Sequence, residues 1–455
     1  MGDYMKKRYV TTFFTALIFS LTLSSTVSAA NSIEDIKTKW RELKPKYQGE
    51  AYIEKPVLTS PYSAGKLSDG ILKDALNMTN FVRYLAGLPN DLELDPVLVD
   101  QAQHGAVVLA ANDELSHYPS KPAGMDDAFY NLGLKSTSSS NIYSGSTNLW
   151  DTVVGYMDDS DTRNIDRVGH RRWVLYPQLK KTGFGLADEY SPMQVFDKSR
   201  TEKVDYSYIS WPNAGYAPNY FFGYKTAWSV LLNPEIYDNE NTDNIKVKLT
   251  RTSDGTTWQF DKNDRDTTGK YFNVETTPYG IPYAIIFRPD NITKYRAGDT
   301  FNVMITGIVD KSGNPTEISY STSFFDLQKQ IYISIYSNKM IVNGEDIEID
   351  PGRNTRPVVV NDRVLLPVRA VIENLGGKID WNAEDNSVTV KLNNNEIKMS
   401  INDKTIFVNG VKKMSDVEPQ IINDRTMIPI RVLAENAGVD VKWEEKAKTV
   451  IITGE

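Results

Sequence analysis

The sequence predicts a multidomain α+β protein, and three observations lead to this fold class. The chain has 455 residues, more than one ordinary core accommodates, because single domains usually contain roughly 100–200 residues. Helical hydrophobic spacing dominates the first half, and short β-branched and aromatic runs follow from about residue 205. The last part repeats itself at an offset of 62 residues. We therefore expect several folded units in series.

The N-terminus has the pattern of a secretory signal peptide over residues 1–30. A basic start at Lys6, Lys7 and Arg8 precedes a short apolar run, and small residues suited to cleavage follow at Ala29. Cleavage is preferred to a retained membrane helix because the run is short, and an uncleaved anchor is the alternative. We expect a secreted, extracellular protein, with association to the cell wall as a further option.

Composition and charge exclude several kinds of function. The chain contains no cysteine, which excludes disulfides, thiolate metal sites and a thiol nucleophile. Its formal net charge is −8, and removal of the signal, with Lys6, Lys7, Arg8 and Asp3, makes it −10. Such an acidic chain has no general attraction to nucleic acid or anionic lipid. The expected partners are a small ligand, a cell-wall polymer or a surface protein, and no transmembrane helix is expected in the mature chain.

The helical half divides into a lead-in over residues 31–69 and a domain over residues 70–204. The lead-in can start a helix at Ser32. In the domain, apolar residues recur at helical spacing before residue 86, and Asp95 with Pro96 supplies an N-cap and an N1 proline for the next helix. Two amphipathic helices are therefore expected before His117.

Residues 205–326 predict an immunoglobulin-like β-sandwich. Short alternating runs such as 245–249 and 301–306 are separated by turn signals, including Asp254-Gly255. Aromatic residues around Trp211 could form a stacking platform for carbohydrate, but a role in filling a small core is the favoured interpretation.

Residues 332–455 contain two copies of one pattern, over about 332–392 and 397–455. The run NDRVLLPVR at 361–369 recurs as NDRTMIPIR at 423–431. Glu-Asn, Gly and Trp residues follow both runs at the same offset. So many matches at one spacing indicate an internal repeat of a small α+β unit.

Each copy predicts a strand, a helix and further strands around a tryptophan. We expect the prolines to start the helices, the glycines to end them and the tryptophans to fill the core, the residues being Pro367, Gly376, Trp381, Pro429, Gly438 and Trp443. Arg369 and Arg431 are best explained by bonds to helix ends or loop carbonyls, with a ligand role as the alternative.

The repeated pattern resembles the copper amine oxidase N-terminal-like domain, or stalk domain, of exported bacterial proteins. The resemblance covers about residues 332–455 and implies an attachment or spacing module at the cell surface. It does not bring copper chemistry with it, because no histidine follows His170 and a histidine-ligated copper site cannot be built there.

With cysteine absent, the candidates for chemistry are three histidines and nearby carboxylates. His104 lies inside an expected helix, where a packing or hydrogen-bonding role is favoured. His117 follows that helix and can contact its last carbonyls or project into a cleft. His170 follows an acidic run that contains Asp158 and Asp159. The run lacks the glycine and the terminal glutamate of an EF-hand, so we reject that calcium loop.

The order of segments resembles the CAP superfamily of cysteine-rich secretory, antigen 5 and pathogenesis-related 1 proteins. Paired helices precede Leu-Ser-His, Asn-Ile, Gly-His-Arg-Arg and Thr-Gly-Phe-Gly, over about residues 70–188. The resemblance implies an α-β-α sandwich whose cleft can hold a divalent metal with two histidines and two glutamates. By motif position His117 and His170 match the histidines. Ser140 stands in place of the first glutamate, and Asp159 is a shortened counterpart of the second, with Asp158 as the alternative.

The resemblance leaves two classes of function open. His117, His170 and Asp159 can bind a divalent metal, zinc or calcium, although the missing carboxylate removes charge and a ligand. The catalytic candidates are His117, His170, Asp159 and Ser140, and a Ser/His/Asp hydrolase would use the last three. No G-x-S-x-G elbow surrounds Ser140, and the incomplete acid set favours binding over catalysis. We expect a ligand-binding or envelope-binding CAP protein with a stalk for attachment or spacing.

Overall fold

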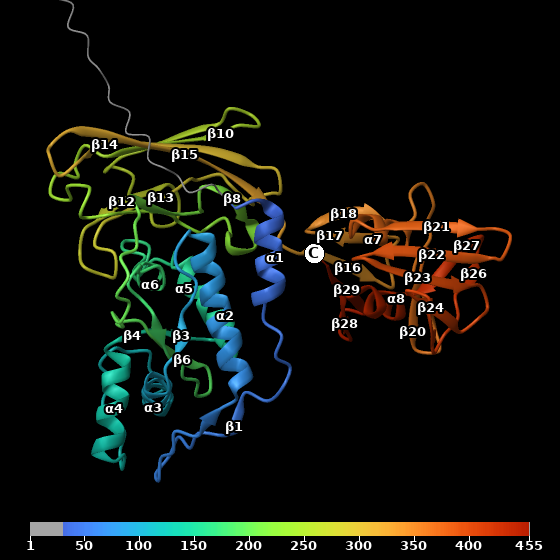
Figure 1. The fold of residues 1–455 in the computed structure, drawn as a ribbon, viewed down its shortest axis with the longest axis horizontal. Coiled ribbons are helices and arrows are strands. Elements are labelled where there is room, and N and C mark those ends of the chain that lie inside the picture. The colour runs from blue at the N-terminus through green and yellow to red at the C-terminus, as the bar shows by residue number, and fades with distance from the viewer. Residues whose placement is uncertain (1–30, 455) are drawn as a thin grey trace, which may run out of the picture.

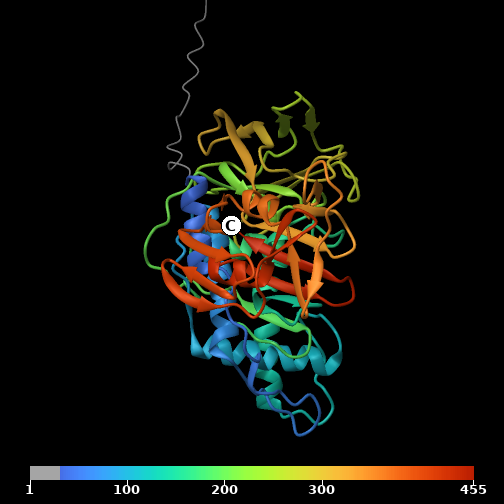
Figure 2. The ribbon, with the colours of Figure 1, turned by 90° about the vertical axis from the view of Figure 1, so that its right-hand side faces the viewer.

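The computed structural model describes residues 31–454, so the expected signal peptide lies outside the described residues. It contains eight α-helices and several β-sheets in this range, which confirms a multidomain α+β protein. A helical region lies below a β-rich middle region, and the C-terminal repeat region stands to one side (Figure 1). In the view of Figure 2, the repeat region lies in front of the other two.

The first helices begin where the sequence predicts. Helix α1 (Ile33–Leu43) starts with a capping box, in which Ser32 and Asp35 satisfy each other's backbone amides. The side chain of Asp95 accepts from two amides at the start of α3, and Pro96 takes the first helical position. The other elements of this stretch are β1 (Tyr52–Glu54), β2 (Lys66–Leu67), α2 (Asp69–Leu85), β3 (Glu93–Leu94) and α3 (Pro96–Asn112).

Two short strands, β4 and β6, form an antiparallel pair that contacts α3, α4 and α5. Side chains alternate along a strand, so Ser140 and Asn141 face opposite ways. The hydroxyls of Ser140 and of Ser136 in α4 both accept from Gln194, whereas the Asn141 amide donates to the carbonyl of His170 in α6. The elements are α4 (Asp127–Thr137), β4 (Ser140–Ser144), α5 (Leu149–Asp158), α6 (Gly169–Val174), β5 (Lys181–Thr182) and β6 (Tyr190–Gln194).

The middle region forms two sheets, with strand orders β11-β10-β14-β15-β8 and β12-β13-β9-β7. Aromatic rings lie between them: Trp228 of β9 contacts Phe301 of β14 with ring centroids 5.5 Å apart. Trp211 is fully buried, as the core-filling interpretation requires. The strands are β7 (Tyr208–Trp211), β8 (Gly215–Pro218), β9 (Trp228–Leu232), β10 (Lys246–Arg251), β11 (Thr257–Phe260), β12 (Tyr271–Glu275), β13 (Ala284–Arg288), β14 (Thr300–Val309) and β15 (Pro315–Phe325), and a 3-10 turn covers η1 (Asn219–Phe221).

One hydrophobic core runs through both the helical and the middle regions. Buried apolar residues form a continuous cluster from Ile36 to Leu327, which crosses the boundary expected near residue 205. A second cluster, from Ile331 to Ile452, lies entirely in the repeat region. The chain therefore has two large cores, although its sequence pattern changes more than once.

The two copies of the repeat exchange strands. Each outer sheet combines three strands of one copy with two of the other, in the orders β18-β17-β16-β29-β28 and β21-β22-β23-β24-β25, and the sheet β19-β20-β27-β26 takes two from each. The elements are β16 (Lys329–Ser334), β17 (Lys339–Val342), β18 (Glu345–Glu348), β19 (Val358–Val360), β20 (Arg363–Leu366), α7 (Arg369–Asn374), β21 (Lys378–Asn382), β22 (Ser387–Leu392), β23 (Asn395–Ser400), β24 (Thr405–Val408), β25 (Val411–Met414), β26 (Gln420–Ile422), β27 (Arg425–Pro429), α8 (Ile430–Ala437), β28 (Asp440–Glu444) and β29 (Thr449–Gly454).

The Asn-Asp-Arg motif of each copy has a structural explanation. Asn361 and Asp362 both have positive φ, 48° and 59°, which is the backbone of a two-residue hairpin turn between β19 and β20. The following arginine pairs with an aspartate of the other copy: Arg363 with Asp416 at 2.5 Å, and Arg425 with Asp350 at 2.7 Å. These two pairs add to the shared sheets and the common core that join the copies.

Two expectations about the repeat are wrong. The prolines do not take the first helical position. Pro429 is the N-cap of α8 and the last residue of β27, because this strand runs directly into the helix. Pro367 lies between β20 and α7 and precedes the N-cap, Val368. The tryptophans do not both fill the core either. Trp381, on the edge strand β21, is 41% exposed, whereas Trp443 is partly buried and packs against the core of the repeat region.

Candidate functional site

His170 is held by a buried carboxylate at the start of α6. Asp159 accepts a hydrogen bond from the backbone amide of His170 at 2.9 Å, and its other oxygen lies 2.8 Å from Nδ1 of the same residue. Asp159 ends α5 in the left-handed conformation, and its side chain is 1% exposed. The carboxylate therefore caps α6 and fixes the imidazole at the same time.

The other side of the imidazole is open. The side chain of His170 is 23% exposed, and its ring lies 5.5 Å from that of Tyr156. Tyr156 donates to the carbonyls of Asn141 and Ser191, and the Asn141 amide donates to the carbonyl of His170 at 2.9 Å. Within the described residues, Nε2 of His170 has no hydrogen-bond partner. The ring is thus fixed through Nδ1 and presents Nε2.

Charge around His170 favours its protonated form. Burial alone lowers the pKa of His170, but the charge of Asp159, the hydrogen bond to it and the charge of Asp161 outweigh that effect and raise the pKa. Arg167 opposes the rise by a smaller amount. When the ring is protonated it donates from both nitrogens, and Nε2–H is then a charged donor on the open side.

The two arginines after His170 join the helical region to the middle region. Arg171 is fully buried and donates to the carbonyls of Met157 and Ala227 and to the Ser229 hydroxyl, at 2.7–2.9 Å. Burial lowers the pKa of Arg171 to about 10. This residue thus connects α5 to β9.

Arg172, also fully buried, donates to the carbonyls of Ile281 and Thr277. Gly280 lies between them with φ +59°, and a Cβ there would lie 2.6 Å from the carbonyl oxygen of Arg172. Sequence reasoning missed both arginine roles, since carbonyl acceptors leave no mark in the side-chain pattern.

Ser140 belongs to a different network. Its hydroxyl accepts from Gln194 at 2.8 Å, and the same amide nitrogen donates to Ser136. The Gln194 oxygen accepts from Gln101 at 2.8 Å and from Ser139. No hydrogen bond joins Ser140 to His170 or Asp159 in the described part of the chain. The structure brings Asp159 and His170 together and places Ser140 on the opposite face of β4.

His117 is exposed in the loop after α3. Its Nδ1 lies 2.7 Å from the carbonyl of Thr137, and the Thr137 hydroxyl donates to the carbonyl of His117 at 3.0 Å. This reciprocal pair ties the loop to the end of α4. Across residues 31–454, no cluster of three or more His, Cys, Asp or Glu side chains is placed to hold a metal ion. The prediction that His117, His170 and Asp159 bind one stays a prediction.

The two remaining candidates have structural partners. Asp158 accepts a hydrogen bond from the hydroxyl of Thr226 at 2.6 Å and so points toward the middle region. His104 lies with its ring 4.3 Å from that of Phe129, and its Nδ1 is 2.8 Å from the carbonyl of Asp100. The expectation that His104 serves packing and hydrogen bonding is confirmed.

The comparisons with known proteins identify two regions by family. Residues 76–195 match the model of the cysteine-rich secretory protein family, so the chain contains a CAP domain. Residues 341–452 match the copper amine oxidase N-terminal domain. The comparison with curated proteins finds no match.

One solved structure is reported among the similar chains, that of an uncharacterized protein from Listeria monocytogenes EGD-e in complex with glucose, magnesium and calcium. It is 11% identical, with a TM-score of 0.16, and the match covers 41% of this chain and 17% of that one. The present chain thus matches less than a fifth of that protein, and the likeness carries no argument about fold or function.

Proposed function

We propose that this is a secreted or cell-surface CAP protein that binds a small ligand or an envelope component at His170. The observation that carries the proposal is the pair formed by His170 and Asp159. A buried carboxylate fixes Nδ1, while Nε2 faces the open side with no protein partner in the described residues. We infer that the helical region is the α-β-α layer arrangement of the CAP family and the middle region a β-sandwich, with the repeat region acting in attachment or spacing.

The chemistry of this pair selects a ligand group that accepts a hydrogen bond. The carboxylate of Asp159 raises the pKa of His170, so the ring is charged over a wider pH range than a free histidine. Charge-assisted hydrogen bonds are roughly twice as strong as neutral ones. We therefore expect a carboxylate or phosphate on the ligand, with affinity falling as pH rises through the pKa of His170.

A second candidate function rests on the same pair. A histidine fixed by a buried carboxylate can also act as a general base. It can equally be a metal ligand whose other ring nitrogen is hydrogen-bonded to that carboxylate. A Ser/His/Asp hydrolase needs its serine within hydrogen-bond reach of Nε2, whereas the hydroxyl of Ser140 accepts from Gln194. This difference favours binding over hydrolysis.

The pair is tested by proton NMR, because the sequence has only three histidines and their ring signals can be assigned by substitution. We expect His170 to titrate above the ordinary histidine value of about 6.5 in the wild type, and Asp159→Asn to lower that pKa. His117→Ala is the control, which should leave the His170 titration unchanged. Equal His170 pKa values in the wild type and Asp159→Asn would contradict the role given to Asp159.

Binding is tested on the same samples with a soluble muropeptide pool from purified cell walls. Binding at the site predicts a shift of the His170 signal that is lost above its pKa, and loss of affinity in His170→Ala. Metal analysis of the wild type and of a His117→Ala/His170→Ala double variant tests the alternative. Metal near one per chain that disappears in the double variant, or hydrolysis of the muropeptides that His170→Ala abolishes, would replace simple binding with the second candidate.

A further inference from the structure

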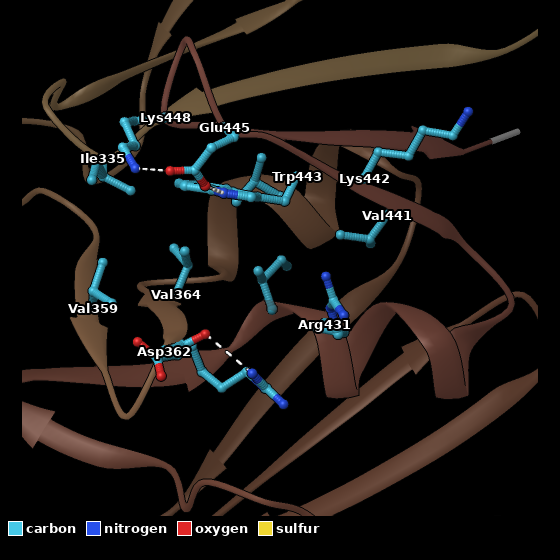
Figure 3. Close-up of a pocket in the computed structure, with 13 residues that line it drawn as sticks. Ile335, Val359, Asp362, Val364, Arg431, Val441, Lys442, Trp443, Glu445 and Lys448 are labelled. Carbon is cyan, nitrogen blue, oxygen red and sulfur yellow. Dashed lines mark hydrogen bonds and ion pairs between the residues drawn. The ribbon is translucent and has the colours of Figure 1, made fainter.

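A pocket of about 390 Å³ opens in the repeat region, far along the chain from His170. It lies between the two copies, with one wall from β19, β20 and their turn and the other from α8, β28 and β29. Figure 3 shows Trp443 and Glu445 on one side of the opening and Asp362 and Arg431 on the other. Its volume is at the lower end of the range of ligand sites, which suits a ligand of one or two rings.

A polar clamp fixes the indole of Trp443. Its Nε1 donates to one oxygen of Glu445 at 2.6 Å, and Lys448 donates to the other oxygen of the same carboxylate. These hydrogen bonds lower the pKa of Glu445, with Lys448 the larger cause, so the group is a carboxylate near neutral pH. The indole edge is occupied, and the ring is held as one wall of the pocket.

Among the described residues, two cations that line this pocket have no partner, Arg431 and Lys442, and Figure 3 shows the Lys442 side chain pointing away from Arg431 and Asp362. Arg363 pairs with Asp416, and Lys448 pairs with Glu445, so both are balanced. Within residues 31–454, no ion pair or hydrogen bond engages the Arg431 side chain, which is exposed and lines the pocket. Its counterpart in the first copy, Arg369, pairs with Glu373 at 3.6 Å.

The two copies differ where the pocket is built. The first copy has Ala383 and Asn386 at the positions of Glu445 and Lys448, so it lacks the carboxylate and the ammonium of the clamp. Trp381, the counterpart of Trp443, is 41% exposed. The scaffold is repeated, but the clamp and the unpaired arginine occur together in the second copy.

We propose that this pocket binds an acidic saccharide, with a sugar ring against Trp443 and its carboxylate on Arg431. Aromatic faces pack on the apolar C–H face of a sugar ring, and the guanidinium matches a carboxylate with two parallel hydrogen bonds. The carboxylates of Asp362 and Glu445 accept hydrogen bonds from sugar hydroxyls. This proposal rests on the attachment role proposed for the repeat region and names the chemistry that the region recognises.

The test uses the mature full chain and galacturonic acid oligomers of two and three sugars, with galactose oligomers as the neutral control. Binding is followed by calorimetry and by the indole N–H signal of Trp443, assigned with Trp443→Phe. Arg431→Gln should weaken binding of the acidic oligomers about tenfold, which corresponds to one charge-assisted contact. Arg369→Gln and Trp381→Phe are the matched controls in the first copy, and both should bind as the wild type does.

Several outcomes would overturn the proposal. These are an indole signal that does not move at millimolar oligomer, equal binding of acidic and neutral oligomers, or equal effects of Arg431→Gln and Arg369→Gln. Binding of the same variants to purified cell walls distinguishes failure of the pocket proposal from failure of the attachment role. If the walls retain the wild type while the oligomers do not bind, the pocket proposal fails and the attachment role stands. If the oligomers bind at Arg431 but the walls do not retain the chain, the attachment role fails and the saccharide site stands.

Discussion

The two cores of this protein use arginine in opposite ways. In the first, Arg171 and Arg172 are fully buried and donate to carbonyls of the middle region, which joins helices and sheets into one unit. In the repeat region, Arg363 and Arg425 lie nearer the surface and pair with aspartates of the other copy. The buried arginines connect two regions with different sequence patterns within one core. The partly exposed Arg–Asp pairs connect the two copies of one repeat.

The comparison also bears on the candidate site. His170 lies directly before the two buried arginines, so its position depends on the middle region as well as on the CAP domain. The pocket at Trp443 depends on contacts between the two copies. Each candidate site therefore lies where two parts of the fold meet, but the first junction is buried and the second is partly exposed.

The largest effect is expected from Arg171→Met. The change removes the donors for two buried carbonyls and a hydroxyl, and each unsatisfied buried group costs about 1–3 kcal/mol. The helical and middle regions share one core and are called the first unit. We expect its free energy of unfolding to fall by about 3 kcal/mol or more, with that of the repeat region unchanged. Urea denaturation followed by circular dichroism measures this, and Arg369→Met is the control. Loss of stability in the repeat region instead would contradict the role given to Arg171 in the first core.

A smaller effect is expected at the aspartates that join the copies. The side chains of Asp350 and Arg425 are 13% and 29% exposed, whereas those of Asp416 and Arg363 are 49% and 35% exposed. Asp350→Ala should therefore destabilise the repeat region by about 1–2 kcal/mol, and Asp416→Ala by less than about 1 kcal/mol. Thermal unfolding of both variants checks the order, and a larger loss in Asp416→Ala would contradict it.

The stabilisation by Asp350 should also depend on pH. Burial raises the pKa of Asp350, but the hydrogen bonds from Arg425 and Thr355 outweigh it, and the net pKa is lowered. A lowered folded pKa means that this stabilisation is present above the unfolded value, about 3.9, and is lost as pH falls through the folded value. The stability difference between the wild type and Asp350→Ala should therefore shrink on acidification. A constant difference down to pH 2 would contradict this assignment.

The smallest effect is expected where the two units meet. Asp326 accepts hydrogen bonds of 2.6 Å from Asn219 of the first unit and Asn343 of the repeat region. Asn343→Ala should leave the first unit's unfolding within about 0.5 kcal/mol of the wild type but increase the spread of distances in X-ray scattering. Asn409→Ala, the counterpart in the second copy, is the control, and the same spread in both variants would rule out a role of Asn343 at this contact.

Much of the local structure could be predicted from the sequence. The cap at Asp95, the hairpin at Asp254-Gly255 and the repeat at Asn361 and Asn423 each depend on neighbouring residues, and all are present. The importance of His170 could also be inferred from the motif around it. These features are local, so a few adjacent residues determine them.

The remainder depends on contacts between distant parts of the chain. Arg171 and Arg172 donate to carbonyls 56 and 109 residues further on, and a backbone acceptor has no sequence signal. Trp381 is exposed on the edge strand β21, and the strand order that puts β21 at the edge was not revealed by the repeat alone. Ser140 is a candidate nucleophile by its sequence position, but its hydroxyl accepts from Gln194 on the neighbouring strand, 54 residues away.

The central claim is that the CAP domain and the middle region unfold together and the repeat region unfolds separately. Differential scanning calorimetry of the mature full chain tests this most directly. We predict two transitions, and because unfolding enthalpy scales with the number of residues, the first unit should account for more than twice the enthalpy of the repeat region. Arg171→Met should move only the larger transition. A third transition, in which the CAP domain unfolds apart from the middle region, would contradict the account.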